Sequence, residues 1–174
     1  MASCPAPRRT TVRRQCAADP GGSRVGVRLS EDEAWSVIAG SHTGILTTLR
    51  RDGAPVALPV WFVVDGHSVL VAGLASTAKF TRARNDQRVS FLVESGLRWA
   101  ELCAVEFTGR AELVDAPEWE ELDARFDAKY AGFRTARADM PASARAHYDG
   151  SRALLRLVPE GRLLTWDNAR LDQR

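Results

Sequence analysis

Three apolar runs, separated by two Asp-Gly pairs, dominate the first half of the chain. Each run is rich in β-branched and aromatic residues, and glycine in the intervening turns accepts the positive φ that a tight hairpin needs. The pattern therefore predicts three consecutive antiparallel strands. The runs are residues 44–50 (GILTTLR), 55–64 (PVALPVWFVV) and 68–73 (SVLVAG), with turns at Asp52-Gly53 and Asp65-Gly66.

The middle run is apolar at nearly every position from Val56 to Val64. A strand with this pattern is buried on both faces, so its second face needs a cover: a helix, the interior of a closed barrel, a second subunit or a flat ligand. Trp61 lies in this run near Pro59, which cannot donate a ladder hydrogen bond. An unpaired strand edge beside an aromatic ring suits a planar ligand, and packing of Trp61 in the core is the alternative.

Capping residues and periodicity predict three or four helices around these strands. Ser30, followed three residues later by Glu33, is typical of a capping box and starts a helix that ends near residue 40. Residues 76–84 form a second, short helix, and a third begins around Pro117. A fourth helical piece covers residues 142–148. Apolar residues of the third helix recur every three or four positions, which indicates one core-facing side: Trp119, Leu122, Phe126, Tyr130 and Phe133.

Further strand-like runs complete the sheet. Residues 88–95 form one strand, and residues 100–116 form a long strand that is bent or bulged near Gly109. Residues 152–168 give two more strands on either side of Pro159-Glu160-Gly161. The sum is an α+β fold that is mainly antiparallel β, with six or seven strands in a small barrel and helices at the periphery.

The composition indicates a boundary near residue 28 between an N-terminal extension and the folded domain. Residues 1–27 are rich in Pro, Gly, Ser and Arg and lack periodicity, so we expect a solvated, disordered extension rather than an arm that binds nucleic acid or lipid. Residues 28–170 then form one domain, and 171–174 a short tail. The sequence contains no apolar run of about 18 residues, the length that a membrane-spanning helix needs. An export signal would require an apolar segment after Arg13-Arg14, and none follows. We therefore expect a cytoplasmic protein.

Familiar catalytic patterns are missing from the sequence. It contains no nucleophile elbow, P-loop or dinucleotide-binding glycine pattern. Its three cysteines and three histidines have no disulfide or metal-ligand spacing, so no metal site is expected and the histidines are interpreted as surface residues. No general acid or other catalytic side chain can be named.

The second helix is unusual because its first turn is basic. Ser76 or Thr77 is the predicted cap, and Lys79, Arg82 and Arg84 lie in and just after the first turn. A helix N-terminus favours anions, so cations at this position oppose the helix dipole, and this mismatch marks the turn for attention.

The order and spacing of several segments resemble the pyridoxamine 5'-phosphate oxidase-like split β-barrel superfamily. The segments are DGAPVALPVWFVVDG, VLVAG, STAKFTRARNDQRVSFLV, VEFTGRAELVD and TWDN, which span about residues 30–170. The resemblance implies a split barrel that forms a two-fold homodimer, with a flavin or deazaflavin in a groove at the subunit interface. It also makes the turn at Lys79 the expected site of the cofactor phosphate.

One departure narrows the expected cofactor. In the oxidases of this superfamily, four cations hold the FMN phosphate, and the matching positions here are Ala57, Phe62, Ala78 and Lys79. Three of these four residues are not cations. Because a phosphate dianion needs charge-assisted donors, FMN is not expected to be bound in the manner of those oxidases. A single lysine in a turn of small residues, with a Pro-Val-Trp strand, resembles the branch that uses the deazaflavin coenzyme F-420.

In that branch the resemblance implies an oxidoreductase that transfers a hydride between the reduced cofactor and a small organic substrate. The cofactor carries the chemistry, and the protein orients it. An FMN-dependent reductase of the same geometry is the first alternative, and a non-catalytic protein that binds flavin, deazaflavin or haem is the second. Arg82 and Arg84 would meet the carboxylates of the oligoglutamate tail, or else be solvated helix arginines. The expected cofactor residues are Pro59, Val60, Trp61, Ala72, Gly73, Ala78, Lys79 and Arg82.

Overall fold

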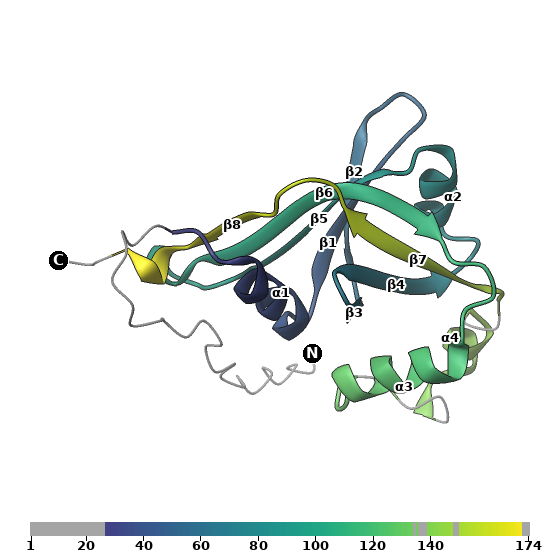
Figure 1. The fold of residues 1–174 in the computed structure, drawn as a ribbon. Helices are drawn as coiled ribbons and strands as arrows, with labels where there is room; N and C mark the ends of the chain where they lie inside the picture. Colours follow the sequence, from purple (N-terminus) through teal and green to yellow (C-terminus); the bar gives the residue numbers. More distant parts are fainter. Residues whose placement is uncertain (1–26, 134, 136–138, 148–149, 172–174) are drawn as a thin grey trace, which may run out of the picture.

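The computed structural model describes residues 27–133, 135, 139–147 and 150–171 (Figure 1). Except for Val27 and Leu171, the predicted N-terminal extension and C-terminal tail lie outside these residues. The elements follow in the order α1 (Glu31–Gly40), β1 (Gly44–Leu49), β2 (Pro55–Val60), β3 (Val63–Asp65), β4 (Ser68–Leu74), α2 (Ala78–Asn85), β5 (Arg88–Ser95), η1 (Trp99–Glu101), β6 (Cys103–Leu113), α3 (Trp119–Lys129), α4 (Ala142–His147), β7 (Arg152–Pro159), β8 (Leu164–Asp167) and η3 (Asn168–Arg170).

All the strands belong to one antiparallel sheet. Its path is β2-β1-β5-β6-β7-β4-β3, and β8 pairs with β6. Figure 1 shows the sheet curled, with α1, α2 and α3 around it. The predicted α+β class with mainly antiparallel strands is confirmed. The described residues contain eight strands rather than six or seven, because the predicted middle strand is divided into two.

The division of that strand is what opens the barrel. Only Trp61 and Phe62 separate β2 from β3, yet these strands lie at opposite ends of the sheet path. β2 pairs with β1, whereas β3 pairs with β4. The chain thus crosses from one end of the sheet to the other, but the two end strands, β2 and β3, do not pair with each other. The barrel is split at this point.

A side chain satisfies the backbone at the break. The Phe62 N–H donates to the hydroxyl oxygen of Tyr130 at 2.8 Å. The same hydroxyl lies 2.9 Å from the carbonyl oxygen of Phe62 and 3.0 Å from that of His42, and donates to one of them. Because buried backbone groups need partners, Tyr130 makes it possible for the chain to leave the sheet here.

β2 is an edge strand with one outward face in the single chain. Exposed Pro55, Ala57 and Pro59 alternate with the half-buried Val56 and Leu58. The two prolines agree with an edge position, because proline cannot donate to a ladder. The predicted burial on both faces is therefore wrong within one chain, where the outer face of β2 is open.

The long strand β6 shows no bulge against β5. Their partners run consecutively from Arg88↔Arg110 to Ser95↔Cys103, which corrects the predicted bulge near Gly109. A Cβ on Gly109 would lie 2.1 Å from the Val158 carbonyl oxygen, so glycine here permits the close approach of β7. Along the other edge of β6, β8 pairs with one half and β7 with the other.

Helices α1 and α3 pack on the sheet through their apolar residues. The predicted capping box of α1 is present, and its Trp35 ring lies 6.3 Å from that of Phe107 in the main core. α3 begins at Trp119, after Ala116 at φ 47°, rather than at Pro117. Its apolar side forms a second core cluster, whose buried members are Leu122, Phe126, Tyr130, Val63, Leu70 and Leu154; Phe133, by contrast, is 64% exposed.

Candidate functional site

The start of α2 has no side-chain cap. Thr77 occupies the N-cap position, but its hydroxyl donates to the Leu74 carbonyl oxygen at 2.9 Å instead of accepting from the helix. The first N–H groups of a helix have no intrahelical partner in the i→i−4 pattern; here the Phe80 N–H donates to the Thr77 carbonyl oxygen at 3.0 Å, which leaves the N–H groups of Ala78 and Lys79 without a side-chain cap. A helix N-terminus in this state is suited to an anion such as a phosphate.

The amine of Lys79 lies at this helix start, above Gly73 of β4. Its Nζ is 3.4 Å from the Thr77 hydroxyl and 4.9 Å from the centre of the Phe80 ring. A Cβ on Gly73 would lie 2.8 Å from the Lys79 Nζ, so the absence of a side chain at Gly73 makes room for the amine. This packing brings two of the predicted residues together.

Arg82 joins the same group from the next turn of α2. Its Nε donates to the hydroxyl of Thr48, which is fully buried in β1, at 2.7 Å. Burial and, secondarily, the charge of Arg82 lower the pKa of the Lys79 amine. Neither cation forms an ion pair with the part of the chain that the structure describes. Two neighbouring cations without an acid would be stabilised by a bound anion.

A second group, of aromatic rings, surrounds the strand break. Trp61 is 37% exposed and stacks on Tyr130, with ring centres 4.3 Å apart and planes 6° apart. His42 stands edge-on to both rings, at 5.7 Å and 5.2 Å, and its ring centre is 4.4 Å from that of Phe133. These four residues are called the aromatic cluster below. Only Trp61 was expected at the site, because the others come from segments far apart in the sequence.

Lys129 lies beside this cluster with a buried amine. Its Nζ is 3.6 Å from the centre of the Phe62 ring and 5.7 Å from that of Tyr130. The nitrogen is enclosed and forms no hydrogen bond with the described residues. Burial lowers the pKa of Lys129 from 10.5 to about 8. Sequence reasoning missed this residue, since nothing in its neighbourhood along the chain distinguishes it from a solvated helix lysine.

The remaining predicted residues flank the split in the barrel. Val63 pairs with Leu70, and continuing that register would set Trp61 opposite Ala72 and Val60 opposite Gly73. Instead, the chain leaves β4 and Val60 pairs with Gly44 of β1. Pro59, Val60 and Trp61 therefore border one side of the opening, and the Ala72-Gly73 edge borders the other.

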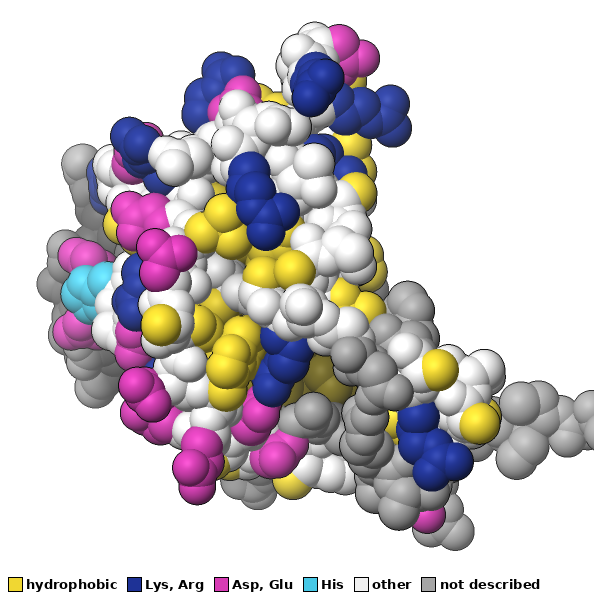
Figure 2. All heavy atoms as spheres, turned by 90° about the vertical axis from the view of Figure 1, so that its right-hand side faces the viewer, with side chains coloured by type: hydrophobic (Ala, Val, Ile, Leu, Met, Phe, Trp, Pro, Cys, Tyr) yellow, Lys and Arg dark blue, Asp and Glu magenta, His cyan; other side chains and the backbone are white. Residues whose placement is uncertain are grey.

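Helices α2 and α3 and strand β4 lie on the right-hand side of the molecule in Figure 1. Figure 2 shows this face, on which hydrophobic side chains are exposed across the middle with Lys or Arg side chains between them. Ala72 and Gly73, being consecutive strand residues, point to opposite faces of β4: Ala72 packs on the α3 cluster, and Gly73 lies under Lys79. Ala78 is exposed at the first position of α2.

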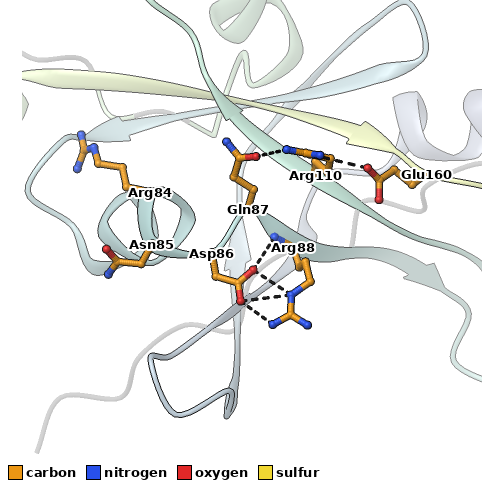
Figure 3. Close-up of a pocket in the computed structure, with 7 residues that line it drawn as sticks. All are labelled: Arg84, Asn85, Asp86, Gln87, Arg88, Arg110 and Glu160. Carbon is orange, nitrogen blue, oxygen red and sulfur yellow. Dashed lines mark hydrogen bonds and ion pairs between the residues drawn. The ribbon is translucent and has the colours of Figure 1, made fainter.

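A separate hollow of roughly 490 Å³ lies at the other end of α2 (Figure 3). Its charges are mostly paired: Arg88 binds both carboxylate oxygens of Asp86, and Arg110 contacts Gln87 and Glu160. The Arg88 hydrogen bonds lower the pKa of Asp86 to about 2. None of the eight predicted cofactor residues lines this hollow, whose lining is Arg84, Asn85, Asp86, Gln87, Arg88, Arg110 and Glu160.

Neither a metal centre nor a membrane span is found in the described part of the chain. No three His, Cys, Asp or Glu side chains within it are grouped so that they could hold a metal ion. Among the same residues, no helix has both the length and the apolar character needed to cross a bilayer.

Comparison with protein-family models gives one match. Residues 30–165, well over half of the chain, match the family described as pyridoxamine 5'-phosphate oxidase. Comparison with curated protein sequences finds no significant match.

Solved structures share the fold. The conserved hypothetical protein Rv2991 from Mycobacterium tuberculosis is 28% identical, with 88% of this chain and 94% of that chain covered and a TM-score of 0.71. An F420 reductase is 21% identical, with 74% and 94% covered and a TM-score of 0.56. The haem storage protein HutZ from Vibrio cholerae is 17% identical, with 78% and 94% covered and a TM-score of 0.60. Proteins with this fold thus have different named functions.

Proposed function

The chain belongs to the pyridoxamine 5'-phosphate oxidase family, and on this premise we propose that it is an oxidoreductase that binds coenzyme F-420. One observation carries the choice of cofactor. Lys79 lies at the uncapped start of α2, and Arg82, in the last turn of this short helix, is near enough to lower the pKa of the Lys79 amine. Ala57 and Phe62, at two positions where the oxidases place phosphate-binding cations, offer no cation. Phe62 is also completely buried. The fold shared with an F420 reductase is consistent with this proposal.

The residues on either side of the split would hold the cofactor. Lys79 and the first N–H groups of α2 would bind the phosphate, because both supply positive charge to one place. The edges at Pro59–Trp61 and Ala72–Gly73 would border the ring, and Gly73 leaves room for the Lys79 amine beside it. Arg82 would meet the first carboxylates of the oligoglutamate tail. The bound deazaflavin supplies the hydride, and the protein orients the ring and excludes water.

A homodimer is part of the same proposal. The outer face of β2 exposes Pro55, Ala57 and Pro59 next to half-buried Ile45 and Leu49 of β1. Small and apolar side chains on an open strand face would be buried by a second copy of the chain. The molecular mass of the purified protein in solution tests this, and a monomer at micromolar concentration would contradict it.

Cofactor titration tests the main proposal. The purified chain is titrated with F-420 and, separately, with FMN and haem, and binding is followed by the absorption of each cofactor. We expect F-420 to bind and Lys79→Ala to weaken its binding by roughly 1–3 kcal/mol, the usual loss for a charge-assisted partner. Arg145→Ala, which removes an exposed cation of α4, is the matched control and should leave affinity unchanged.

The rival functions predict different spectra. An FMN-dependent reductase would bind FMN more tightly than F-420, and a haem-binding protein, favoured by the fold shared with the haem storage protein, would give a Soret band. Absence of F-420 binding would refute the proposed cofactor. Unchanged F-420 affinity in Lys79→Ala would remove Lys79 from the phosphate site.

A further inference from the structure

Lysine is used very selectively in this chain. Of its 24 Lys and Arg residues, only Lys79 and Lys129 are lysines. Both are partly buried, and burial lowers the pKa of both amines. Lys79 has a place in the proposed phosphate site. Lys129 has no such explanation, because its amine meets only aromatic rings among the described residues.

The free energy of this arrangement is unfavourable without a further partner. Taking an ammonium out of water costs free energy. The cation–π interaction with the face of Phe62 offsets only part of this cost. An ammonium ordinarily donates three hydrogen bonds, and here no described acceptor receives any of them. An oxygen-bearing ligand would supply what the protein does not.

The neighbouring rings indicate the shape of such a ligand. Trp61 and Phe133 remain 37% and 64% exposed, although both are large and apolar. They contact His42, whose ring links them, and Trp61 is held flat against Tyr130. Flat aromatic surfaces favour stacking with a planar, conjugated molecule. The titratable residue in contact with Lys129 is Tyr130, whose ring centre lies 5.7 Å from the amine and whose hydroxyl has a pKa raised by burial; the His42 ring contacts the far side of this group, at Tyr130.

We propose that Lys129 and the aromatic cluster form the substrate-binding part of the site, which accepts a planar conjugated carboxylate. In the ligand-bound protein the carboxylate pairs with the Lys129 amine, which the ligand-free structure encloses, and the conjugated part stacks on Trp61 and Phe133. If the reduced deazaflavin is bound, its hydride would form a C–H bond at the β-carbon as the C=C π bond breaks, a proton from water would complete the α-carbon, and the Lys129 ammonium would stabilise the charge that develops on the carboxylate. This inference rests on the proposed function, because it names the acceptor class of that reaction; Lys129 is a substrate-positioning residue.

Binding of trans-cinnamate to the full-length protein without cofactor tests the assignment. Titration calorimetry at pH 7 compares cinnamate with trans-cinnamamide, a neutral analogue of the same shape. We expect cinnamate to bind and Lys129→Met to raise its Kd roughly 10- to 100-fold, with Lys129→Arg restoring part of the affinity. The Kd for cinnamamide should be the same in the wild type and in Lys129→Met. Lys79→Met is the matched control, because the Lys79 amine lies at the start of α2 rather than beside the aromatic cluster.

Proton uptake gives a second readout that a purely structural role would not produce. A carboxylate raises the pKa of a neighbouring ammonium, so at pH 8 cinnamate binding should take up protons in the wild type. Calorimetry in buffers of different ionisation enthalpy measures this uptake, which should vanish in Lys129→Met. Uptake that persists in that variant would come from another group and overturn the role of Lys129.

Other results would also refute the inference. Failure of the wild type to bind cinnamate would remove the ligand class, and a Kd changed by Lys79→Met but not by Lys129→Met would place the carboxylate at α2. The assay contains no F-420, so a failure to bind cinnamate can be distinguished from a failure to bind F-420. Lys129→Met removes a buried charge, so the variant should fold, and circular dichroism checks that it does.

Discussion

The Lys129→Met substitution should stabilise the ligand-free protein at neutral pH. Methionine has a similar length and no charge, so it leaves the packing on Phe62 and removes the buried ammonium. The pKa falls from 10.5 to about 8 on folding, and 2.5 units at about 1.36 kcal/mol each would correspond to at most about 3.4 kcal/mol. The side chain is only partly buried, and solvent screening reduces this figure. We expect a gain of about 1–3 kcal/mol at pH 7.

The sign of the pH dependence follows from proton binding. Between pH 8 and pH 10.5 the unfolded chain keeps the Lys129 proton and the folded chain loses it, so wild-type stability rises with pH in this window. The penalty is fully present below pH 8 and has disappeared above pH 10.5. The advantage of Lys129→Met should therefore shrink as the pH rises from 8 to 10.5.

Urea denaturation of the wild type and of Lys129→Met at several pH values measures both free energies of unfolding. Subtracting one from the other cancels the contributions of the other groups that titrate in this range. Arg145→Met removes an exposed cation and should show neither the gain nor the pH dependence. An advantage that stays constant from pH 7 to pH 10.5, or a variant less stable than the wild type at pH 7, would refute the reasoning.

Two further substitutions test other parts of the argument. Gly73→Ala places a Cβ 2.8 Å from the Lys79 Nζ, and the amine should move away because it is the end of a flexible side chain. We expect F-420 affinity to fall about tenfold and the free energy of unfolding to change by less than about 1 kcal/mol. Gly150→Ala, whose Cβ would meet Leu74 at an ordinary 3.5 Å, is its control in the same titration. Tyr130→Phe removes the hydroxyl that accepts from the Phe62 N–H and should cost about 1–3 kcal/mol in urea denaturation; an unchanged midpoint would show that the break does not need this hydroxyl.

Local patterns in the sequence predicted most of the elements. The Asp-Gly turns have Gly53 and Gly66 at positive φ, and the capping box at Ser30 is formed as expected. These features depend on residues close together in the chain, where φ preferences and short side-chain hydrogen bonds decide the outcome. The basic start of α2 was predicted only in part, because Lys79 lies in the first turn whereas Arg82 and Arg84 lie in the last turn. Periodicity, however, gave no sign that Trp61 and Phe62 lie outside any strand.

What the sequence determined by itself was the antiparallel sheet, the presence of the helices and the capped start of α1. It also pointed to Lys79 and Arg82, which lie on consecutive turns of α2. Only the tertiary structure decided where the barrel opens, because that depends on Tyr130 reaching Phe62, 68 residues away along the chain. The burial of the Lys129 amine and the meeting of His42 with Trp61 and Phe133 were decided in the same way. Side-chain solvation and ring contacts depend on which distant segments pack together, and no local pattern carries that information.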